Sequence, residues 1–150
     1  MTSSVQILVG TTTGNAQYCA EEAAAALQEA GIEATVMPMD NLDAGVFATG
    51  GDFLICVSTY GQGDVPDNAR QLYESLVRDK PDLAAVRYGV VSLGDRSHAQ
   101  TFCFAGRRFD SALSKLGAIR IGEVLNHDAS SGTMPEEATR DWMAGFIAQR

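Results

Sequence analysis

Short runs of hydrophobic residues recur along the chain and predict five β-strands, at residues 5–10, 33–38, 52–58, 86–93 and 119–125. Most of these runs do not alternate with polar residues, which is typical of strands buried on both faces of a parallel sheet. Between the runs, hydrophobic residues recur every three to four positions, as they do in an amphipathic helix. The pattern therefore predicts strands and helices in alternation.

Four helices are expected, each with one buried face. The first starts at Asn15 and stops at Gly31, the second opens at Pro66-Asp67, and the last spans residues 135–148. The residues expected to be buried are, in chain order, Ala16, Cys19, Ala20, Ala23, Leu27 and Ala30; Ala69, Leu72, Tyr73, Leu76 and Val77; Phe102, Ala105, Phe109, Ala112, Leu113 and Leu116; and Ala138, Trp142 and Phe146.

This alternation predicts an α/β fold in which helices cover both faces of a five-stranded parallel sheet. Right-handed crossovers leave few topologies for 150 residues, and the expected strand order is 2-1-3-4-5. No linker or repeat interrupts the pattern, so residues 1–150 are expected to form a single domain. Such a fold binds its ligand where the first and third strands diverge.

The charge of the chain limits its partners. It has 19 acidic and 11 basic residues, for a net charge of -8. This balance argues against binding nucleic acid, which requires clustered Lys and Arg. The acidity suits a partner with a basic face, or serves solubility alone.

Cys19, Cys56 and Cys103 are odd in number and lack C-x-x-C spacing, which favours reduced thiols in a cytoplasmic protein. The N-terminus is short and polar, so neither a signal peptide nor a membrane span is expected. His98 and His127 lack the spacing of a metal site.

The loop at residues 10–16, Gly-Thr-Thr-Thr-Gly-Asn-Ala, joins the first strand directly to a helix. Amides at a helix N-terminus and threonine hydroxyls together form an anion site. The loop has no Lys for a triphosphate and no G-x-G-x-x-G for a dinucleotide, so a single terminal phosphate is the expected ligand. The alternative is that the threonines only cap the helix.

Two further loops follow the third and fourth strands, at residues 58–68 and 93–103. In the first of these, Tyr60 could stack on one face of a planar ligand. In the second, His98 could cover the other face. Cys103 has no adjacent base or resolving cysteine, so a packing role is expected for it, and Cys56 is expected in the core because it lies within a predicted strand.

Together the motifs GTTTGNA at 10–16, STYGQGDVPDN at 58–68 and LGDRSHAQTFC at 93–103 resemble the flavodoxin family, over essentially the whole chain. The similarity is closest to the short-chain, MioC-like branch and to the FMN domains of sulfite reductase and cytochrome P450 reductase. The resemblance implies a flavodoxin-like three-layer sandwich that binds FMN. The residues that would contact FMN are Thr11, Thr12, Thr13, Gly14, Asn15 and Ala16 at the phosphate; Ser58, Thr59, Tyr60 and Gly61 beside the isoalloxazine; Leu93, Gly94, Asp95, His98, Phe102 and Cys103 around the ring and ribityl chain; and Asp128 at a late acidic position.

The resemblance implies a monomeric electron carrier rather than an enzyme, with no catalytic residues of its own. It would shuttle low-potential electrons, one at a time, from an NADPH-dependent flavodoxin/ferredoxin reductase to acceptor enzymes. Acids on the expected cofactor rim, namely Asp64, Asp67, Asp95 and Asp128, would lower the second reduction potential and dock a basic partner.

One position departs from the family, which usually places Tyr where His98 stands. An imidazole offers less aromatic area and can gain charge near neutral pH. The departure predicts weaker FMN binding or a pH-dependent reduction potential.

Three other functions are open alternatives. A flavin-dependent quinone or NAD(P)H reductase would usually need added loops over the flavin. A signalling receiver domain would need an acidic pair near the first strand and an Asp after the third, where this chain has Thr-rich and Ser-Thr-Tyr sequence. The third alternative is a flavodoxin-like scaffold that has lost FMN binding, and His98 is the only residue that suggests it.

Overall fold

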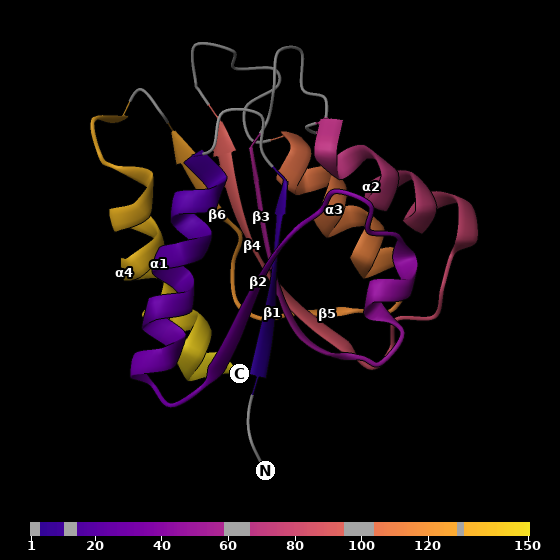
Figure 1. Ribbon diagram of the computed structural model, residues 1–150, viewed down its shortest axis with the longest axis horizontal. Coiled ribbons are helices and arrows are strands. Elements are labelled where there is room, and N and C mark those ends of the chain that lie inside the picture. Colours follow the sequence, from indigo (N-terminus) through magenta and orange to yellow (C-terminus); the bar gives the residue numbers. More distant parts are fainter. Residues whose placement is uncertain (1–3, 11–14, 59–66, 95–103, 129–130) are drawn as a thin grey trace.

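The computed structural model describes residues 4–10, 15–58, 67–94, 104–128 and 131–150 (Figure 1). Its elements, in chain order, are β1 (Ser4–Gly10), α1 (Asn15–Glu29), β2 (Glu33–Pro38), the 3-10 helix η1 (Ala44–Phe47), β3 (Gly51–Ser58), α2 (Asp67–Asp79), β4 (Val86–Gly94), α3 (Phe104–Lys115), β5 (Ile119–Arg120), β6 (Leu125–Asp128) and α4 (Pro135–Gln149).

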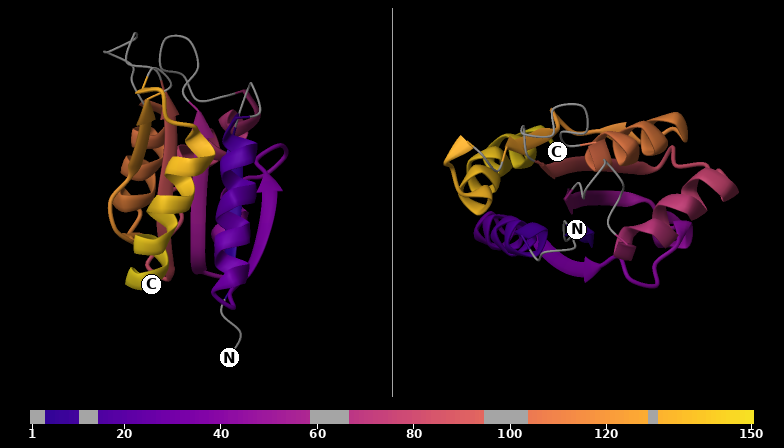
Figure 2. Two further views of the ribbon diagram at one scale, coloured as in Figure 1. Left: turned by 90° about the vertical axis from the view of Figure 1, so that its left-hand side faces the viewer. Right: turned by 90° about the horizontal axis from the view of Figure 1, so that it is seen from above.

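The strands form one parallel sheet in the order β2-β1-β3-β4-β5, which confirms the predicted α/β fold and strand order. Helices α1 and α4 cover one face of the sheet, and α2 and α3 cover the other (Figures 1 and 2). Alternate residues of each central strand point to opposite faces. In β3, for example, Leu54 and Cys56 pack toward α1, whereas Phe53 and Ile55 pack toward α2 and α3.

The predicted fifth strand at 119–125 is wrong in its extent. The structure has two short strands along the same edge of β4 instead: β5 pairs at Arg87 and Tyr88, and β6 pairs from Val91 to Gly94. Gly122 lies between them with a φ of 72°, in the left-handed region rather than the extended one. Strand β6 then continues to the end of β4, three residues beyond the predicted limit.

The helix η1 has no counterpart among the predicted elements. Asp43 caps it by accepting a hydrogen bond from the Gly45 amide at 2.9 Å. Its buried Phe47 packs edge-on against Phe53 of β3, with ring centroids 4.7 Å apart. This short helix extends the α2–α3 side of the core.

Helix burial follows the predicted faces with a few corrections. Ala30 is exposed because α1 ends at Glu29, and Val77 is half-exposed at the edge of α2. Trp142 is only partly buried, because its ring stacks on Phe146 while its Nε1 donates to the Glu123 carbonyl at 3.0 Å. Tyr73, Ala112, Leu116 and Ala138 are likewise partly buried, and Phe102 lies outside the described residues. The buried residues of α4 are Thr139, Met143 and Phe146.

Gly89 of β4 explains how α4 approaches the sheet so closely. A Cβ atom at Gly89 would lie 2.6 Å from the Phe146 ring, which is closer than van der Waals contact allows. The absence of a side chain on the strand therefore makes room for a large aromatic on the helix.

Candidate cofactor site

The carboxyl ends of β1, β3, β4 and β6 meet at one edge of the sheet. The register places Gly10 beside Val57, Ser58 beside Leu93, and Gly94 beside Asp128. We call this row of strand ends the carboxyl edge. Residues that are distant in the sequence are thus brought level with one another at this edge.

The carboxyl edge includes the topological switch point of the sheet. The helix that follows β1 lies on one face, and the helix that follows β3 lies on the other, although the two strands are neighbours (Figure 2). In sheets of this kind, ligands bind in the crevice opened by that divergence. The predicted location of the site is therefore consistent with the arrangement of the strands and helices.

Six of the predicted site residues are described by the structure, and all six lie at or beside this edge: Asn15, Ala16, Ser58, Leu93, Gly94 and Asp128. The other eleven lie outside the described residues, namely Thr11, Thr12, Thr13, Gly14, Thr59, Tyr60, Gly61, Asp95, His98, Phe102 and Cys103.

The first turn of α1 carries no acidic residue. Asn15 is exposed there, and Ala16 is buried against the core. The first backbone N–H groups of a helix lack intrahelical acceptors and carry positive partial charge. A phosphate group fits this end because no carboxylate of the turn competes for those amides.

Gly10 fixes how closely α2 approaches the end of β1. A Cβ atom at this position would lie 2.8 Å from the Ala69 Cβ and 3.0 Å from the Met39 sulfur. Only glycine leaves space for both neighbours, so the start of α2 packs directly over the last residue of β1. The first turn of α2 therefore lies close to the end of β1 at the carboxyl edge.

Asn68 and Asp40 also lie at this edge, although neither was among the predicted site residues. The Asn68 Nδ2 donates to the Asp40 carboxylate at 3.3 Å and to the Val9 carbonyl at 3.5 Å. Asp40 follows Met39, whose amide donates to the same Val9 carbonyl at 2.8 Å. The position of Asp40, two residues after β2, was the signal in the sequence that could have identified it.

His127 anchors the far side of the carboxyl edge. It is buried next to Leu93 in the pairing of β4 with β6, and its Nε2 donates to the Thr133 carbonyl at 2.8 Å. This bond ties the end of β6 to the segment that leads into α4. Asp128 follows immediately and is partly buried beside Gly94.

Of the four acids expected on the rim, Asp128 is placed with its side chain, and Asp67 is the first residue of α2. Asp64 and Asp95 lie outside the described residues. Asp40 and Asp128 are therefore the acidic side chains that the described part of the chain brings to this edge.

The described cysteines are core residues. Burial raises the pKa of the Cys56 thiol well above its usual value, and the nearby Cys19 raises it further. Burial also raises the pKa of Cys19, against the opposing effect of a hydrogen bond with Thr139. Cys56 lies within β3 and is fully buried, which confirms the core position predicted for it.

Within the described residues, no helix is long and apolar enough to cross a bilayer. The same part of the chain contains no group of three or more His, Cys, Asp or Glu residues arranged to hold a metal ion.

Comparison with known proteins identifies the family. The flavodoxin family model matches residues 7–142. Protein MioC of Escherichia coli K12 is 34% identical over 145 residues, which cover 97% of each chain. The sulfite reductase [NADPH] flavoprotein alpha-component of Bacillus subtilis is 35% identical over 148 residues, which cover 98% of this chain and 24% of that protein.

A solved structure agrees with these matches. A cysteine-to-alanine mutant of flavodoxin from Pseudomonas aeruginosa superposes with a TM-score of 0.87, at 34% identity and 97% coverage of both chains. The resemblance predicted from the three loop motifs is confirmed, and the chain belongs to the flavodoxin family of flavin-binding electron-transfer proteins.

Proposed function

We propose that this protein binds FMN at the carboxyl edge and carries low-potential electrons, one at a time, between redox proteins. The observation that carries the proposal is the α1 N-terminus, free of acidic residues in its first turn, beside the strand ends of a flavodoxin-family chain. The expected donor is an NADPH-dependent flavodoxin/ferredoxin reductase, and the acceptors are enzymes that need single electrons. The protein would act in the cytoplasm as a monomer, with residues 1–150 forming one domain.

In this proposal the chain holds the phosphate through the α1 amides and Asn15, together with Thr11, Thr12, Thr13 and Gly14 from the sequence motif. Ser58, Thr59 and Gly61 line one edge of the ring, and Tyr60 stacks on one face. Leu93, Gly94, Asp95, His98, Phe102 and Cys103 contact the ring and the ribityl chain. FMN, when bound, supplies the redox chemistry, so the protein needs no acid, base or nucleophile.

Negative charge at the carboxyl edge would lower the reduction potential of the bound FMN. A carboxylate about 8 Å from the ring raises the free energy of a developing negative charge by about 2 kcal/mol at an effective dielectric constant of about 20. In this proposal Asp40 and Asp128 act in this way, together with Asp64, Asp67 and Asp95 of the sequence motifs. These acids would lower the potential of the second electron and favour one-electron transfer.

The test compares FMN with riboflavin, which has the same ring system but no phosphate. We expect the flavin-free protein to bind FMN at least about a hundredfold more tightly than riboflavin, because charge-assisted bonds to a phosphate are each worth roughly 1.5–3 kcal/mol. Isothermal titration calorimetry measures both affinities. Equal affinities, or no binding of either flavin, would contradict the proposal.

Two further measurements separate the carrier from its alternatives. Stepwise reduction followed by visible absorption should resolve two one-electron steps. Purified FMN-loaded protein should not oxidise NADPH by itself, with or without a quinone. Sustained NADPH oxidation would instead favour the flavin-dependent reductase, and failure to bind FMN would favour a scaffold that has lost its cofactor.

The substitution His98→Tyr tests the residue at which this chain departs from its family. A larger ring should stack over more of the flavin, so we expect tighter FMN binding and a reduction potential that varies less between pH 6 and 8. Fluorescence quenching measures the affinity, and dye-coupled reduction measures the potential. If neither quantity changes, His98 does not contact the flavin as proposed.

A further inference from the structure

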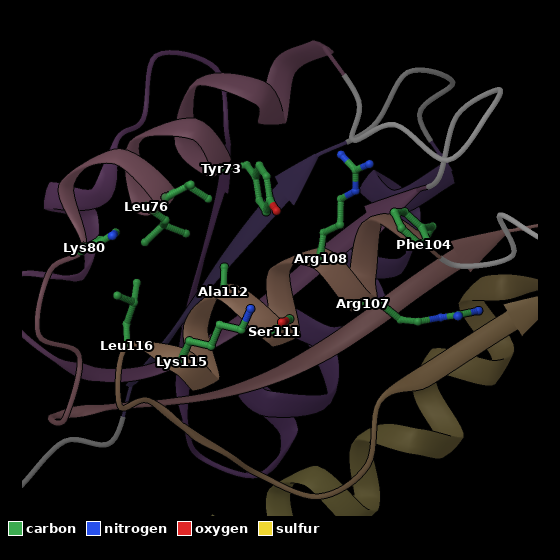
Figure 3. Close-up of a pocket in the computed structure, with 11 residues that line it drawn as sticks. Tyr73, Leu76, Lys80, Phe104, Arg107, Arg108, Ser111, Ala112, Lys115 and Leu116 are labelled. Carbon is green, nitrogen blue, oxygen red and sulfur yellow. The ribbon is translucent and has the colours of Figure 1, made fainter.

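A hollow lies between α2 and α3, on the face of the sheet that these two helices cover. It has a volume of about 590 Å³. We call it the α2–α3 groove (Figure 3). Its apolar lining consists of Tyr73, Leu76, Val77, Phe104, Ala112 and Leu116. Tyr73 also contacts Phe109 edge-on at 5.5 Å, which holds the two helices together at the base.

Several apolar side chains of the groove are exposed to solvent. Val77 is 50% exposed, and it is one of four large hydrophobic residues that are exposed in the described part of the chain. Phe104, the first residue of α3, and Leu116, the residue after its end, are only partly buried. A contiguous apolar surface with a polar rim is the usual mark of a binding surface.

The rim of the groove is basic, in contrast with the acidic chain as a whole. Lys80, Arg107, Arg108 and Lys115 line it, and among the residues that the structure describes no Asp or Glu does. These four residues are more than a third of the 11 basic residues in a chain with 19 acids. Positive charge is therefore concentrated at this groove, although the chain as a whole is negative.

Two of these cations have no acidic partner among the described residues, because neither Lys80 nor Lys115 forms an ion pair there. Arg108 packs over the Phe104 ring at 4.7 Å and extends from α3 toward α2, whereas Arg107 points away from the groove (Figure 3). Lys80, Arg108 and Lys115 are thus available to an anionic occupant.

The length of the groove indicates the shape of that occupant. Its lining runs from Phe104 to Leu116, the full length of α3. Twelve helical residues span about 18 Å. A slot of this length between two helices matches an amphipathic helix laid along it, with apolar residues at positions i, i+3, i+4 and i+7.

We propose that the α2–α3 groove docks an acidic amphipathic helix of a partner protein. The helix sets its apolar face on Tyr73, Val77 and Leu116, and its carboxylates meet Lys80, Arg108 and Lys115. Complementary charge speeds the encounter and fixes the register, and burial of the apolar face supplies the affinity. The lining comes from α2 and α3 and includes none of the strand ends, so we expect docking not to require FMN.

The probe is a fluorescein-labelled synthetic helix about 15 residues long, with Leu on one face and Glu on the others. Its control carries Lys in place of every Glu. Fluorescence anisotropy, with the protein as purified and with added FMN, should detect binding of the Glu peptide and not of the Lys peptide. Binding should weaken as salt is raised, because the rim charges are exposed to solvent.

Substitutions locate the binding. The pair Arg108→Glu and Lys115→Glu should weaken the Glu peptide at least about tenfold. Val77→Ser should also weaken it while leaving every charge in place. The matched control is Arg78→Glu, which lies on α2 outside the lining and should leave binding unchanged. Circular dichroism confirms that each variant is folded.

Three results would overturn the proposal. The first is no binding of the Glu peptide, or binding that the groove substitutions do not alter. The second is self-association of the protein in analytical ultracentrifugation that Lys115→Glu abolishes, which would assign the groove to a second copy of this chain. The third is binding of dodecanoate in the groove without binding of the peptide, which would assign it to a small amphipathic anion.

Discussion

Asp52, the second residue of β3, is the point on which two arginines converge. Its carboxylate accepts two hydrogen bonds from Arg87 of the neighbouring strand, both at 3.0 Å, and one from Arg150 at 2.8 Å. The Asp52 side chain is only 7% exposed, so little water is available to replace these partners. One carboxylate therefore ties the last residue of the chain to two central strands.

The substitution Asp52→Asn should lower the free energy of unfolding by about 2 kcal/mol, because it removes the charge that both guanidinium groups face. Urea denaturation measures the change. The matched control is Asp79→Asn, which breaks an ion pair whose side chains are 70% and 50% exposed. Water screens such an exposed pair, so it adds little to stability. Equal losses in the two variants would mean that the convergence on Asp52 adds nothing.

At the scale of elements, Gly122 divides the edge of the sheet into β5 and β6. Its φ of 72° lies in the left-handed region, where a Cβ atom costs about 1–2 kcal/mol. We expect Gly122→Ala to destabilise the protein by that amount. Gly145→Ala should instead stabilise it by about 0.5–1 kcal/mol, because Gly145 is inside α4 and its added Cβ meets nothing nearer than 3.8 Å.

Thermal unfolding of the two glycine variants checks the opposite signs. A stabilising effect of Gly122→Ala would mean that the break between β5 and β6 is not imposed by backbone conformation at that residue. The pair of variants adds the same methyl group in both cases, so hydrophobicity alone cannot account for a difference between them.

The N-terminal turn of α1 makes a second prediction at this scale, concerning Asn15→Asp. A carboxylate there should stabilise the helix by about 0.3–1 kcal/mol through its dipole. The same charge should repel a phosphate and weaken FMN binding about tenfold. Riboflavin binding is the control and should not change. Loss of affinity for both flavins would indicate a general disturbance of the site rather than a phosphate contact.

Element types and their order could be predicted from the sequence because each strand and helix has a strong hydrophobic period. The break in the edge strand could not, because Gly122 lies within the apolar run Ile-Arg-Ile-Gly-Glu-Val-Leu. Partial burial of Trp142 was missed for a related reason. Helical spacing identifies which face of the helix Trp142 lies on. It does not show that the indole donates a hydrogen bond to the backbone carbonyl of Glu123.

Some residues of the candidate site could also be predicted from the sequence, and others could not. Ser58, Leu93 and Gly94 could be located because strand ends of a parallel sheet meet at one edge, and the register confirms it. Asp40 and Asn68 were missed, since their meeting depends on how the segment after β2 packs against the start of α2. Motifs mark the residues inside each loop, whereas contacts between segments require the packed structure.

For the molecule as a whole, charge is distributed unevenly along the chain. Residues 1–69 contain nine acids and no Lys or Arg, and all 11 basic residues follow from Arg70 onward. This half of the chain contributes β1, α1, β2 and β3, which include the switch point of the carboxyl edge. Asp40 and Asp128 lie at the carboxyl edge, so we expect a basic redox partner to be steered toward it at a rate that depends on salt.

The position of the charge, rather than its total, should control that rate. Asp40→Asn with Asp128→Asn removes two negative charges at the carboxyl edge. Asp79→Asn with Glu29→Gln removes two at the ends of α2 and α1, away from it. The first pair should slow reduction by an NADPH-dependent reductase and flatten its dependence on salt, and the second pair should change neither. Stopped-flow mixing at ionic strengths of about 0.02 and 0.2 M measures both effects, since screening shortens with salt. Equal slowing by the two pairs would mean that only the net charge of -8 matters, and that the partner does not dock at the carboxyl edge.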